Sequence, residues 1–318
     1  MIALHTKLKM KTNFTQIGYF TLSAYVDTGH FTYLYVIILL FLYILIICSN
    51  LLLIVIICMN RRLHEPMYIF LCSLFVNEVY GSTALFPFIL GQIPYDIHIV
   101  SAYICFLQVF CVYSYGSVEF FTLTIMSYDR YVAICFPLEY NTCMTSNKVA
   151  MLIALTWLPP LLVVVGLTSM SFSLQLCGNI INNVYCDNNS IVRLACSNTS
   201  IHNIYGLIST ALIVFVPLIF ILYTYIRILK VCFSGSKQTR QKAVSTCTPH
   251  LASLLNFSFG CFFEVLQNRF KINNLPDKFG IFVSLYFVTC QMLFNPVLYG
   301  LKMSTMRKIC ARLFQCEV

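Results

Sequence analysis

An acidic and a basic residue stand side by side in one of the most apolar parts of this 318-residue chain. Asp129 and Arg130 lie within MSYDRYVAIC (residues 126–135), directly after a long apolar stretch. An arginine guanidinium has a planar set of donors that can leave a carboxylate and bind other oxygens instead. The pair therefore has two interpretations: a solvated charge at a membrane boundary, or an ion pair that opens in a conformational change.

Two further acids lie inside apolar stretches. Glu78 is halfway along residues 66–92, and Glu119 precedes Arg130 by 11 residues, which is about 16 Å along a helix. Ionisable groups at mid-bilayer depth are costly and usually functional. The two carboxyl groups either bind a sodium ion or a proton between them, or are simply buried as neutral acids.

The elements that position these residues belong in a membrane. Hydrophobic residues make up 59% of the chain, charged residues only 10%, and the mean hydropathy is +0.81, whereas soluble domains carry about 25% charged residues. Continuous apolar runs near the roughly 20 residues of a spanning helix predict helices and not barrel strands. We place seven helices at residues 31–58, 66–92, 102–131, 148–170, 203–230, 242–268 and 279–301.

These segments predict an all-α membrane protein with a seven-helix bundle. Residues 1–30 form an extracellular tail, 31–301 the transmembrane domain, and 302–318 a cytoplasmic amphipathic helix and tail. The last segment is expected in the membrane interface because apolar and basic residues separate onto two faces. Cys310 and Cys316 in it are either palmitoylated or free thiols.

The distribution of Lys and Arg predicts the orientation. One side of the predicted topology receives thirteen of the 20 basic residues: Arg61, Arg62, Arg130, Lys148, Arg227, Lys230, Lys237, Arg240, Lys242, Lys302, Arg307, Lys308 and Arg312. That side is cytoplasmic by the positive-inside rule, so the N-terminus is extracellular and the C-terminus cytoplasmic. The net charge of +9 then reflects topology and contact with the lipid bilayer, and no nucleic acid is expected as a partner.

The third helix can be measured against this topology. Cys105 to Arg130 is 25 residues, about 37 Å at 1.5 Å per residue. With Cys105 at the outer surface, Asp129 and Arg130 lie at the cytoplasmic end, where a charge is tolerated.

Four cysteines fall on the outer side and predict two disulfide bonds, with three pairings open: Cys105, Cys177, Cys186 and Cys196. Three N-glycosylation sequons are on the same side, at Asn13, Asn188 and Asn198. No enzyme is indicated, because the six His are scattered and no HExxH, phosphate loop or nucleophile elbow occurs. No repeat relates the two halves, which disfavours a transporter.

Five segments together carry a family resemblance: LHEPMYIFL (63–71), MSYDRYVAIC (126–135), TYIRIL (224–229), RQKAVSTCTPHL (240–251) and NPVLYGL (295–301). From about Asn50 to Arg307 the chain resembles a rhodopsin-like G-protein-coupled receptor and, more narrowly, a vertebrate odorant receptor of the teleost fish type. The resemblance implies a small-molecule odorant as ligand, a stimulatory heterotrimeric G protein as partner, and the plasma membrane of olfactory cilia as location. A related chemoreceptor with a non-olfactory ligand is the alternative.

The resemblance also implies roles for single residues. The residues implied in activation and G-protein coupling are Asp129, Arg130, Tyr131, Tyr225, Asn295, Pro296 and Tyr299. Those implied in a buried sodium site, the one ion expected, are Asn50, Glu78, Glu119 and Asn295. The implied disulfide pairings are Cys105 with Cys186 and Cys177 with Cys196.

The implied odorant pocket lies in the outer half of the bundle. Its candidate residues are Val112, Tyr113, Gly116, Ser117, Ser209, Ile213, Cys261, Val265, Leu285 and Thr289. Val112 cannot pair an ammonium group, so a neutral or weakly polar ligand is expected. Glu264 and Arg269 near the mouth would suit a charged ligand but are better explained as a solvated rim.

Two positions depart from the odorant-receptor pattern. Ser258 stands where these receptors generally have a Tyr that acts in helix 6, so that role is in doubt. Asn183 stands where many have a His three residues before the loop cysteine, so no copper site is expected.

Overall fold

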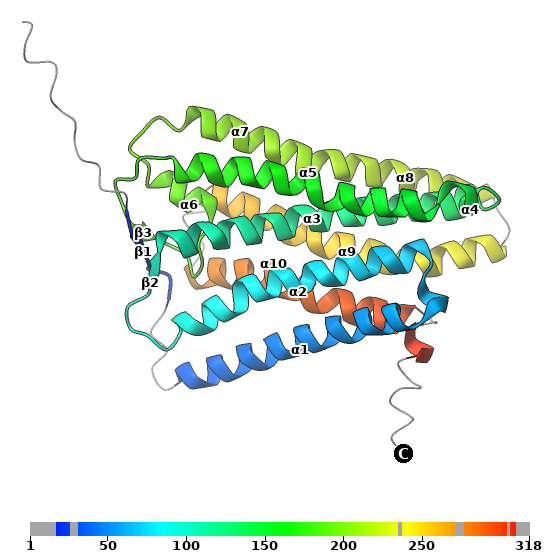
Figure 1. The fold of residues 1–318 in the computed structure, drawn as a ribbon, viewed down its shortest axis with the longest axis horizontal. Coiled ribbons are helices and arrows are strands. Elements are labelled where there is room, and N and C mark those ends of the chain that lie inside the picture. The colour runs from blue at the N-terminus through cyan, green and yellow to red at the C-terminus, as the bar shows by residue number, and fades with distance from the viewer. Residues whose placement is uncertain (1–16, 26–30, 235–236, 271–276, 304–305, 310–318) are drawn as a thin grey trace, which may run out of the picture.

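Seven long helical segments form the bundle, and the computed structural model describes residues 17–25, 31–234, 237–270, 277–303 and 306–309. The helices are α1 (Thr32–Met59), α2 (Pro66–Gln92), α3 (Ala102–Cys135), α5 (Ser146–Phe172), a continuous segment of α7 (Ser200–Thr210), η3 (Ala211–Phe215) and α8 (Val216–Ser234), then α9 (Lys237–Phe270) and α10 (Asp277–Lys302). The helices run side by side along the long axis of the molecule (Figure 1). The predicted seven-helix fold is confirmed.

Local sequence explains where individual helices begin and bend. The side chain of Ser101 accepts a hydrogen bond from the Ile104 N–H at the start of α3, and Thr145 does the same for Lys148 at the start of α5. The single π-helical segment described, η3, ends just before Pro217. Pro217 has no N–H to donate to the carbonyl of residue 213, which favours a wider turn there.

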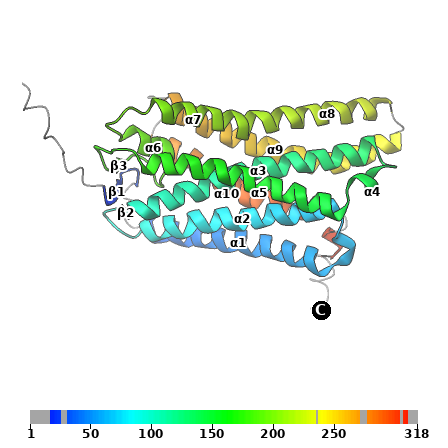
Figure 2. The same cartoon turned by 45° about the horizontal axis from the view of Figure 1, so that its top comes forward.

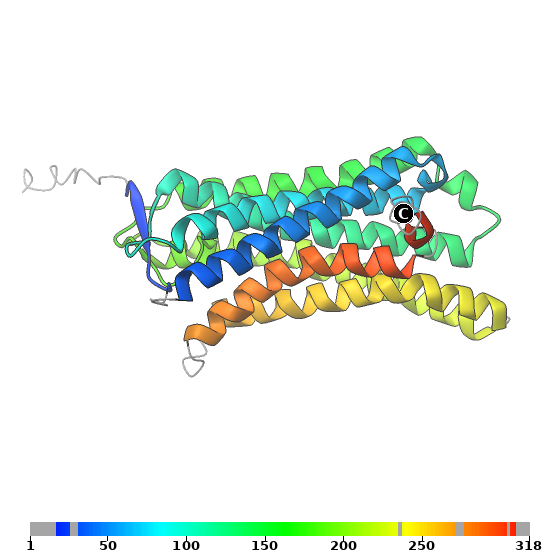
Figure 3. The same ribbon diagram turned by 90° about the horizontal axis from the view of Figure 1, so that it is seen from below.

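Helix α3 lies at the centre of the bundle and contacts α2, α5, α8 and α9. Figure 2 shows α3 between the layers formed by its neighbours, and Figure 3 shows α9 and α10 lying along each other. Among the described residues, five helical segments are long and apolar enough to cross a membrane: α1, α2, α3, α5 and Ser200–Ser234. Many of their exposed side chains are large and apolar, as expected for surfaces that face lipid.

One end of the bundle, the strand end, carries a small sheet. Strand β1 (Tyr19–Leu22) lies between β2 (Ile99–Ser101), which is antiparallel to it, and β3 (Ile180–Ile181), which is parallel. The short helix α6 (Asn188–Arg193) and both disulfide bonds, Cys105–Cys186 and Cys177–Cys196, are also at this end. The strand end is at the left in Figure 1.

The opposite end, the α4 end, carries the short elements η2 (Arg61–Leu63) and α4 (Tyr140–Cys143). Residues 306–309 form a helical turn there, and Met306 is fully buried against a core that includes Ile57 and Tyr299. This turn is the described part of the expected amphipathic helix. The candidate palmitoylation sites Cys310 and Cys316 and the sequon at Asn13 lie outside the described residues.

Two boundaries differ from the sequence-based expectation in ways that affect function. Helix α3 ends at Cys135 and not at residue 131, so Asp129 and Arg130 are more than one turn inside the helix. Residues 19–22 of the expected extracellular tail are a paired strand with Phe20 and Leu22 buried.

Candidate functional site

The acid–base pair forms the first part of the site, at the α4 end of α3. Nε of Arg130 donates to Oδ2 of Asp129 at 3.0 Å, and its Nη2 donates to the same oxygen. The hydroxyl of Tyr140 in α4 donates to the other carboxylate oxygen at 2.7 Å. The Asp129 side chain is fully buried and that of Arg130 is 14% exposed. The pair is therefore a shielded ion pair and not a solvated boundary charge.

Tyr140 was missed at the sequence level, because nothing in a loop tyrosine indicates a partner on α3. Burial, and then the nearby Asp129 carboxylate, raise the pKa of its hydroxyl. The hydroxyl therefore stays protonated and can keep donating to Asp129.

A second hydrogen-bond chain joins three helices beside this pair. The hydroxyl of Tyr225 on α8 donates to Nδ1 of His250 on α9, and Nε2 of His250 donates to the Leu123 carbonyl on α3 at 2.9 Å. This pattern fixes the neutral tautomer of the histidine. His250 is fully buried. The sequence signal that could have found it is a single histidine inside a long helical segment.

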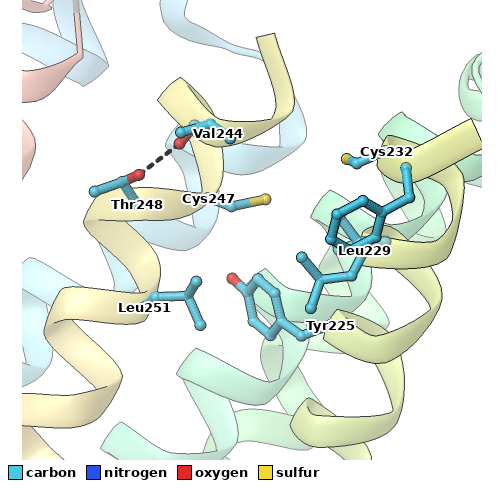
Figure 4. A pocket seen from close by; sticks show the side chains of 9 residues that line it. Tyr225, Leu229, Cys232, Val244, Cys247, Thr248 and Leu251 are labelled. Carbon is cyan, nitrogen blue, oxygen red and sulfur yellow. Dashed lines mark hydrogen bonds between the residues drawn. The ribbon is translucent and has the colours of Figure 1, made fainter. Parts of the chain in front are cut away.

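A cavity of about 340 Å³ separates α8 from α9 at this end. Its lining is apolar apart from hydroxyl and thiol groups: Tyr225, Ile228, Leu229, Cys232, Phe233, Val244, Cys247, Thr248 and Leu251. Figure 4 shows the Cys247 thiol directed from α9 toward α8 and the Cys232 thiol directed back across the space. The two helices are thus poorly packed against each other where Tyr225 lies, which leaves α9 room to move.

The acids form the second part of the site, in the middle of the bundle. Glu78 accepts a hydrogen bond from the Tyr115 hydroxyl at 3.0 Å and another from the Asn295 amide. Glu119 accepts from Asn295 at 3.0 Å and from Asn77 at 3.1 Å. The Asn295 amide nitrogen donates to both carboxyl groups, so the two acids lie close together. Two buried carboxylates this close cannot both be charged cheaply, so the arrangement calls for a proton or a cation beside them.

Close packing brings Tyr115 to Glu78. A side chain at Gly81 would place a Cβ atom 2.5 Å from Cδ2 of Tyr115, so the tyrosine ring occupies the space that glycine leaves. Gln291 extends the cluster to α9, since its amide donates to Glu119 at 3.2 Å and to the Ser253 hydroxyl at 3.1 Å.

The chemistry of the cluster fits a hard cation such as sodium. Asn50 and Asn77 each have a fully buried side-chain oxygen with no hydrogen-bond partner in the described structure. Oxygen atoms of this kind, with two carboxyl groups, are the donors that hard cations prefer. Asn295 fits less well, because its oxygen already accepts from Ser253 at 2.6 Å and its amide N–H donates to both acids.

The predicted odorant residues lie toward the strand end. Val112 and Tyr113 are half-buried in two neighbouring apolar clusters, and Ser117 is buried with its hydroxyl bonded to the Tyr113 carbonyl at 2.7 Å. A Cβ added at Gly116 would lie 4.0 Å from the Phe257 ring. The remaining described candidates are Ser209 (buried), Ile213 in η3, and Cys261 and Thr289 (both half-buried). The side chains of Val265 and Leu285 lie outside the described residues, as do those of Glu264 and Arg269.

The comparison with known proteins decides the family. The olfactory receptor family profile matches residues 39–317. The chain is 34% identical to human olfactory receptor 10A3 over 82% of each chain, and 34% identical to human olfactory receptor 10A5 over 79% of each. Human olfactory receptor 52N1 is 32% identical over 79% of each chain.

This chain belongs to the olfactory receptor family. It is therefore a multi-pass membrane protein that detects odorants and is not an enzyme, and coupling to a G protein is general for this family. The resemblance to a rhodopsin-like odorant receptor is confirmed, whereas the fish-type assignment stays a prediction.

The receptor brings together most of the residues predicted from the sequence. Asp129 pairs with Arg130, and the two acids form one cluster with Asn295. Both implied disulfide bonds are present.

The remaining residues implied in activation lie near the α4 end. Tyr299 is fully buried near Phe75, with ring centroids 6.4 Å apart, and follows Pro296 on α10. Tyr131 contributes a ring contact with Phe136 at 5.6 Å. Among the described residues, neither tyrosine forms a hydrogen bond with Arg130, whereas Asp129 accepts two from it.

The fold argues against one predicted glycosylation site. Asn188 is only 3% exposed, and its side-chain oxygen accepts a hydrogen bond from the Ser171 hydroxyl at 2.5 Å, so it has no room for a glycan in this fold. Asn198 is exposed and stays a candidate. The sequon pattern cannot distinguish the two, because burial is set by the packing of α5, α6 and α7.

Proposed function

We propose that this receptor binds a small, neutral, mostly apolar odorant in the strand-end half of the bundle and activates a stimulatory heterotrimeric G protein at the α4 end. The observation that carries the proposal is the shielded Asp129–Arg130 pair beside the α8–α9 cavity. An arginine fork held by one carboxylate can exchange it for tyrosine hydroxyls and partner carbonyls at small net cost.

Activation would break the ion pair within α3 and the hydrogen bond between α8 and α9 at the α4 end. Arg130 leaves Asp129, and Tyr225 leaves His250, as α9 moves away from α8 at the cavity. The Tyr225 hydroxyl, no longer held toward His250, can then accept a hydrogen bond from the guanidinium.

Helix α10 would supply the second acceptor. Pro296 gives this helix a place to bend, since proline removes one intrahelical hydrogen bond. A bend there would carry the Tyr299 hydroxyl toward Arg130. The opened end offers Arg130 and Tyr131 to the G protein.

The ligand half supports a neutral odorant. Val112 and Tyr113 contribute apolar and aromatic surface, and Ser117 and Ser209 contribute hydroxyl groups. Ligand sites of this composition favour apolar molecules with one or two polar groups.

The orientation follows from charge. The α4 end carries Arg61, Arg62 and Arg227, whereas both disulfide bonds are at the strand end. Positive charge favours the cytoplasm and disulfide bonds favour the oxidising side. We therefore place the N-terminus outside the plasma membrane and the C-terminus inside, in the cilia of olfactory neurons.

The acid cluster would hold a sodium ion or a proton in the inactive receptor. Glu78, Glu119, Asn50 and Asn77 supply the oxygens, and Asn295 orients the two carboxyl groups. The positive charge of the bound sodium ion or proton would favour the arrangement in which α2, α3 and α10 stay joined. Release of that ion or proton would favour activation.

The test is odorant-evoked cAMP in cells that express the receptor, compared between wild type and Arg130→Gln. We expect the response to fall to background while surface expression is kept. Arg227→Gln is the matched control, because Arg227 is an exposed arginine at the same end and is outside the pair. A full response from Arg130→Gln, or electrogenic flux without a G protein, would contradict the proposal.

A further inference from the structure

Strand β1 is the middle strand of the sheet that covers the strand end. Its backbone is bonded on both sides: the Leu22 N–H donates to the His98 carbonyl at 2.9 Å, and the Thr21 N–H donates to the Asn179 carbonyl at 2.7 Å. The segment before α1 is thus joined both to the connection that leads into α3 and to the loop that holds Cys186.

The side chains of β1 alternate between solvent and the bundle. Phe20 and Leu22 are fully buried in an apolar cluster that contains the Cys105–Cys186 disulfide, whereas Tyr19 is 53% exposed. The strand is therefore fixed onto the end of the helix bundle by apolar side chains as well as by its backbone.

Tyr25 follows this strand and reaches from it into the bundle. Its ring stacks on His98 with centroids 4.1 Å apart, and its hydroxyl donates to the Val184 carbonyl at 2.8 Å. Burial raises the pKa of this hydroxyl, so it remains a donor. Tyr25 thereby connects the start of the chain to the loop beside the disulfide.

Tyr25 also packs against both clusters that contain proposed odorant contacts. One is the disulfide cluster, which includes Tyr113, and the other includes Val112 and Tyr185. No other described residue of the segment before α1 belongs to both clusters. Tyr25 thus packs at the strand end against the clusters that hold Val112 and Tyr113.

We propose that Tyr25 is a specificity-determining residue of the receptor: with β1 it forms the outer wall of the odorant site and limits which molecules reach Val112 and Tyr113. The inference rests on the proposed function, since it assumes that odorants bind in this half. The wall presents an aromatic face, and its one hydroxyl is already bonded to Val184. It therefore favours slender neutral molecules, and loss of the ring would admit bulkier ones.

The test measures access directly and needs no known agonist. Val112→Cys provides a thiol behind the wall, and methanethiosulfonate ethyltrimethylammonium is added outside intact cells. We expect Tyr25→Ala to raise the labelling rate of this thiol by about tenfold, because the rate scales with the population of the open strand end. Receptor with Val112 intact gives the background from native cysteines, and rates are normalised to the receptor at the cell surface.

Two control variants accompany this measurement. Tyr19→Ala should leave the rate unchanged, because Tyr19 is a tyrosine on the same segment with its side chain in solvent. Tyr25→Phe keeps the ring and removes only the hydroxyl, so it should raise the rate far less than Tyr25→Ala does. Equal labelling rates with and without Tyr25→Ala, or no labelling of the thiol in either background, would overturn the proposal, because Tyr25 would then not control access.

A second measurement separates this proposal from the proposed function. Straight-chain alcohols from butanol to decanol are compared by evoked cAMP before and after the thiol is labelled. If Tyr25→Ala speeds labelling but the labelled receptor still responds fully, Tyr25 controls access to a space that odorants do not use. That result would overturn the specificity role and the proposed ligand site, while leaving the coupling at Arg130 intact.

Discussion

The two ends of the receptor are held together by different kinds of interaction. At the strand end, the loops and the segment before α1 are joined by two disulfide bonds, a three-stranded sheet and fully buried side chains such as Phe20 and Leu22. At the α4 end, the Tyr140–Asp129 hydrogen bond joins α4 to α3 and the Tyr225–His250 hydrogen bond joins α8 to α9. The Asp129–Arg130 pair within α3 and a cavity lie beside these bonds. Covalent bonds and the cooperative backbone pairing of a sheet are hard to break, whereas single side-chain ion pairs and hydrogen bonds can be exchanged.

This difference matches the work that each end must do. A ligand site needs walls that stay in place, because rigidity lowers the cost of binding. A switch needs two arrangements of similar free energy. The acid cluster of Glu78 and Glu119 lies between the two ends and touches α2, α3 and α10, so it is placed to connect them.

The largest expected effect is loss of the strand-end disulfide bond on α3. Cys105→Ser should nearly abolish surface expression, since removal of a native disulfide typically costs about 2–5 kcal/mol. Cys177→Ser should be milder: the two bonds join residues 81 and 19 apart in sequence, which corresponds to a difference of about 1.3 kcal/mol in loop entropy. Flow cytometry of tagged receptor measures both. A larger loss of surface expression from Cys177→Ser than from Cys105→Ser would show that β1 and the buried side chains suffice to hold α3.

The next effect concerns the acid cluster. One carboxylate oxygen of Glu119 accepts from Asn77, and the other accepts from Asn295 and Gln291. In Glu119→Gln an NH₂ group replaces one of these oxygens, so a donor faces a donor on that side. An unsatisfied buried group costs about 1–3 kcal/mol, and we expect basal cAMP to rise by about fivefold or more. Basal cAMP is measured in sodium and in N-methylglucamine buffers.

Wild-type receptor should signal less in sodium than in N-methylglucamine, and Glu119→Gln should lose that difference. Thr122→Val is the control and should keep it, because Thr122 is buried on the same helix and its hydroxyl bonds the Val118 carbonyl, outside the cluster. A wild-type signal that is the same in both buffers would exclude sodium and leave a shared proton as the occupant.

A smaller effect is expected from the α4 helix. Tyr140→Phe removes the hydrogen bond to Asp129 while the ring is kept. Because the hydroxyl is only partly buried, we expect a loss of about 1 kcal/mol, which would raise basal cAMP by about fivefold. Tyr128→Phe is the control, since the Tyr128 hydroxyl at the same end accepts from Lys148 and does not contact Asp129. Equal basal cAMP from both variants would show that Tyr140 does not restrain the pair.

The sequence predicts where the helices lie, because a continuous apolar run of sufficient length identifies each one. It also predicts the depth of single residues, because a helix rises 1.5 Å per residue whatever it packs against. The helical rise places Arg130 near the end of α3, although the helix continues to Cys135, and it puts Glu78 and Glu119 at one depth. The same reasoning could not find Gln291 or Tyr115, although both are polar groups in apolar helices. Which polar groups meet depends on how the helices are rotated, and that is set by contacts such as the one between Gly81 and Tyr115.

The sheet was missed for a different reason. Strand β1 has four residues, and their partners are far along the chain: Tyr19 pairs with Ser101, 82 residues later, and Thr21 pairs with Ile180, 159 residues later. The alternation of apolar and polar residues over so short a segment was a weak signal for a strand. Short strands with distant partners are specified by the surface on which they pack, here the disulfide cluster, and that surface exists only in the folded receptor.

The smallest expected effect separates the two sequons of the strand end. Asn198→Gln should remove one glycosidase-sensitive shift in electrophoretic mobility, because Asn198 is exposed. Asn188→Gln should leave the mobility unchanged, since its side chain is buried against Ser171. The longer Gln side chain should instead lower thermal stability by about 1 kcal/mol through overpacking. A mobility shift from Asn188→Gln would mean that α6 detaches from α5, so that part of the strand end is less fixed than its disulfide bonds suggest.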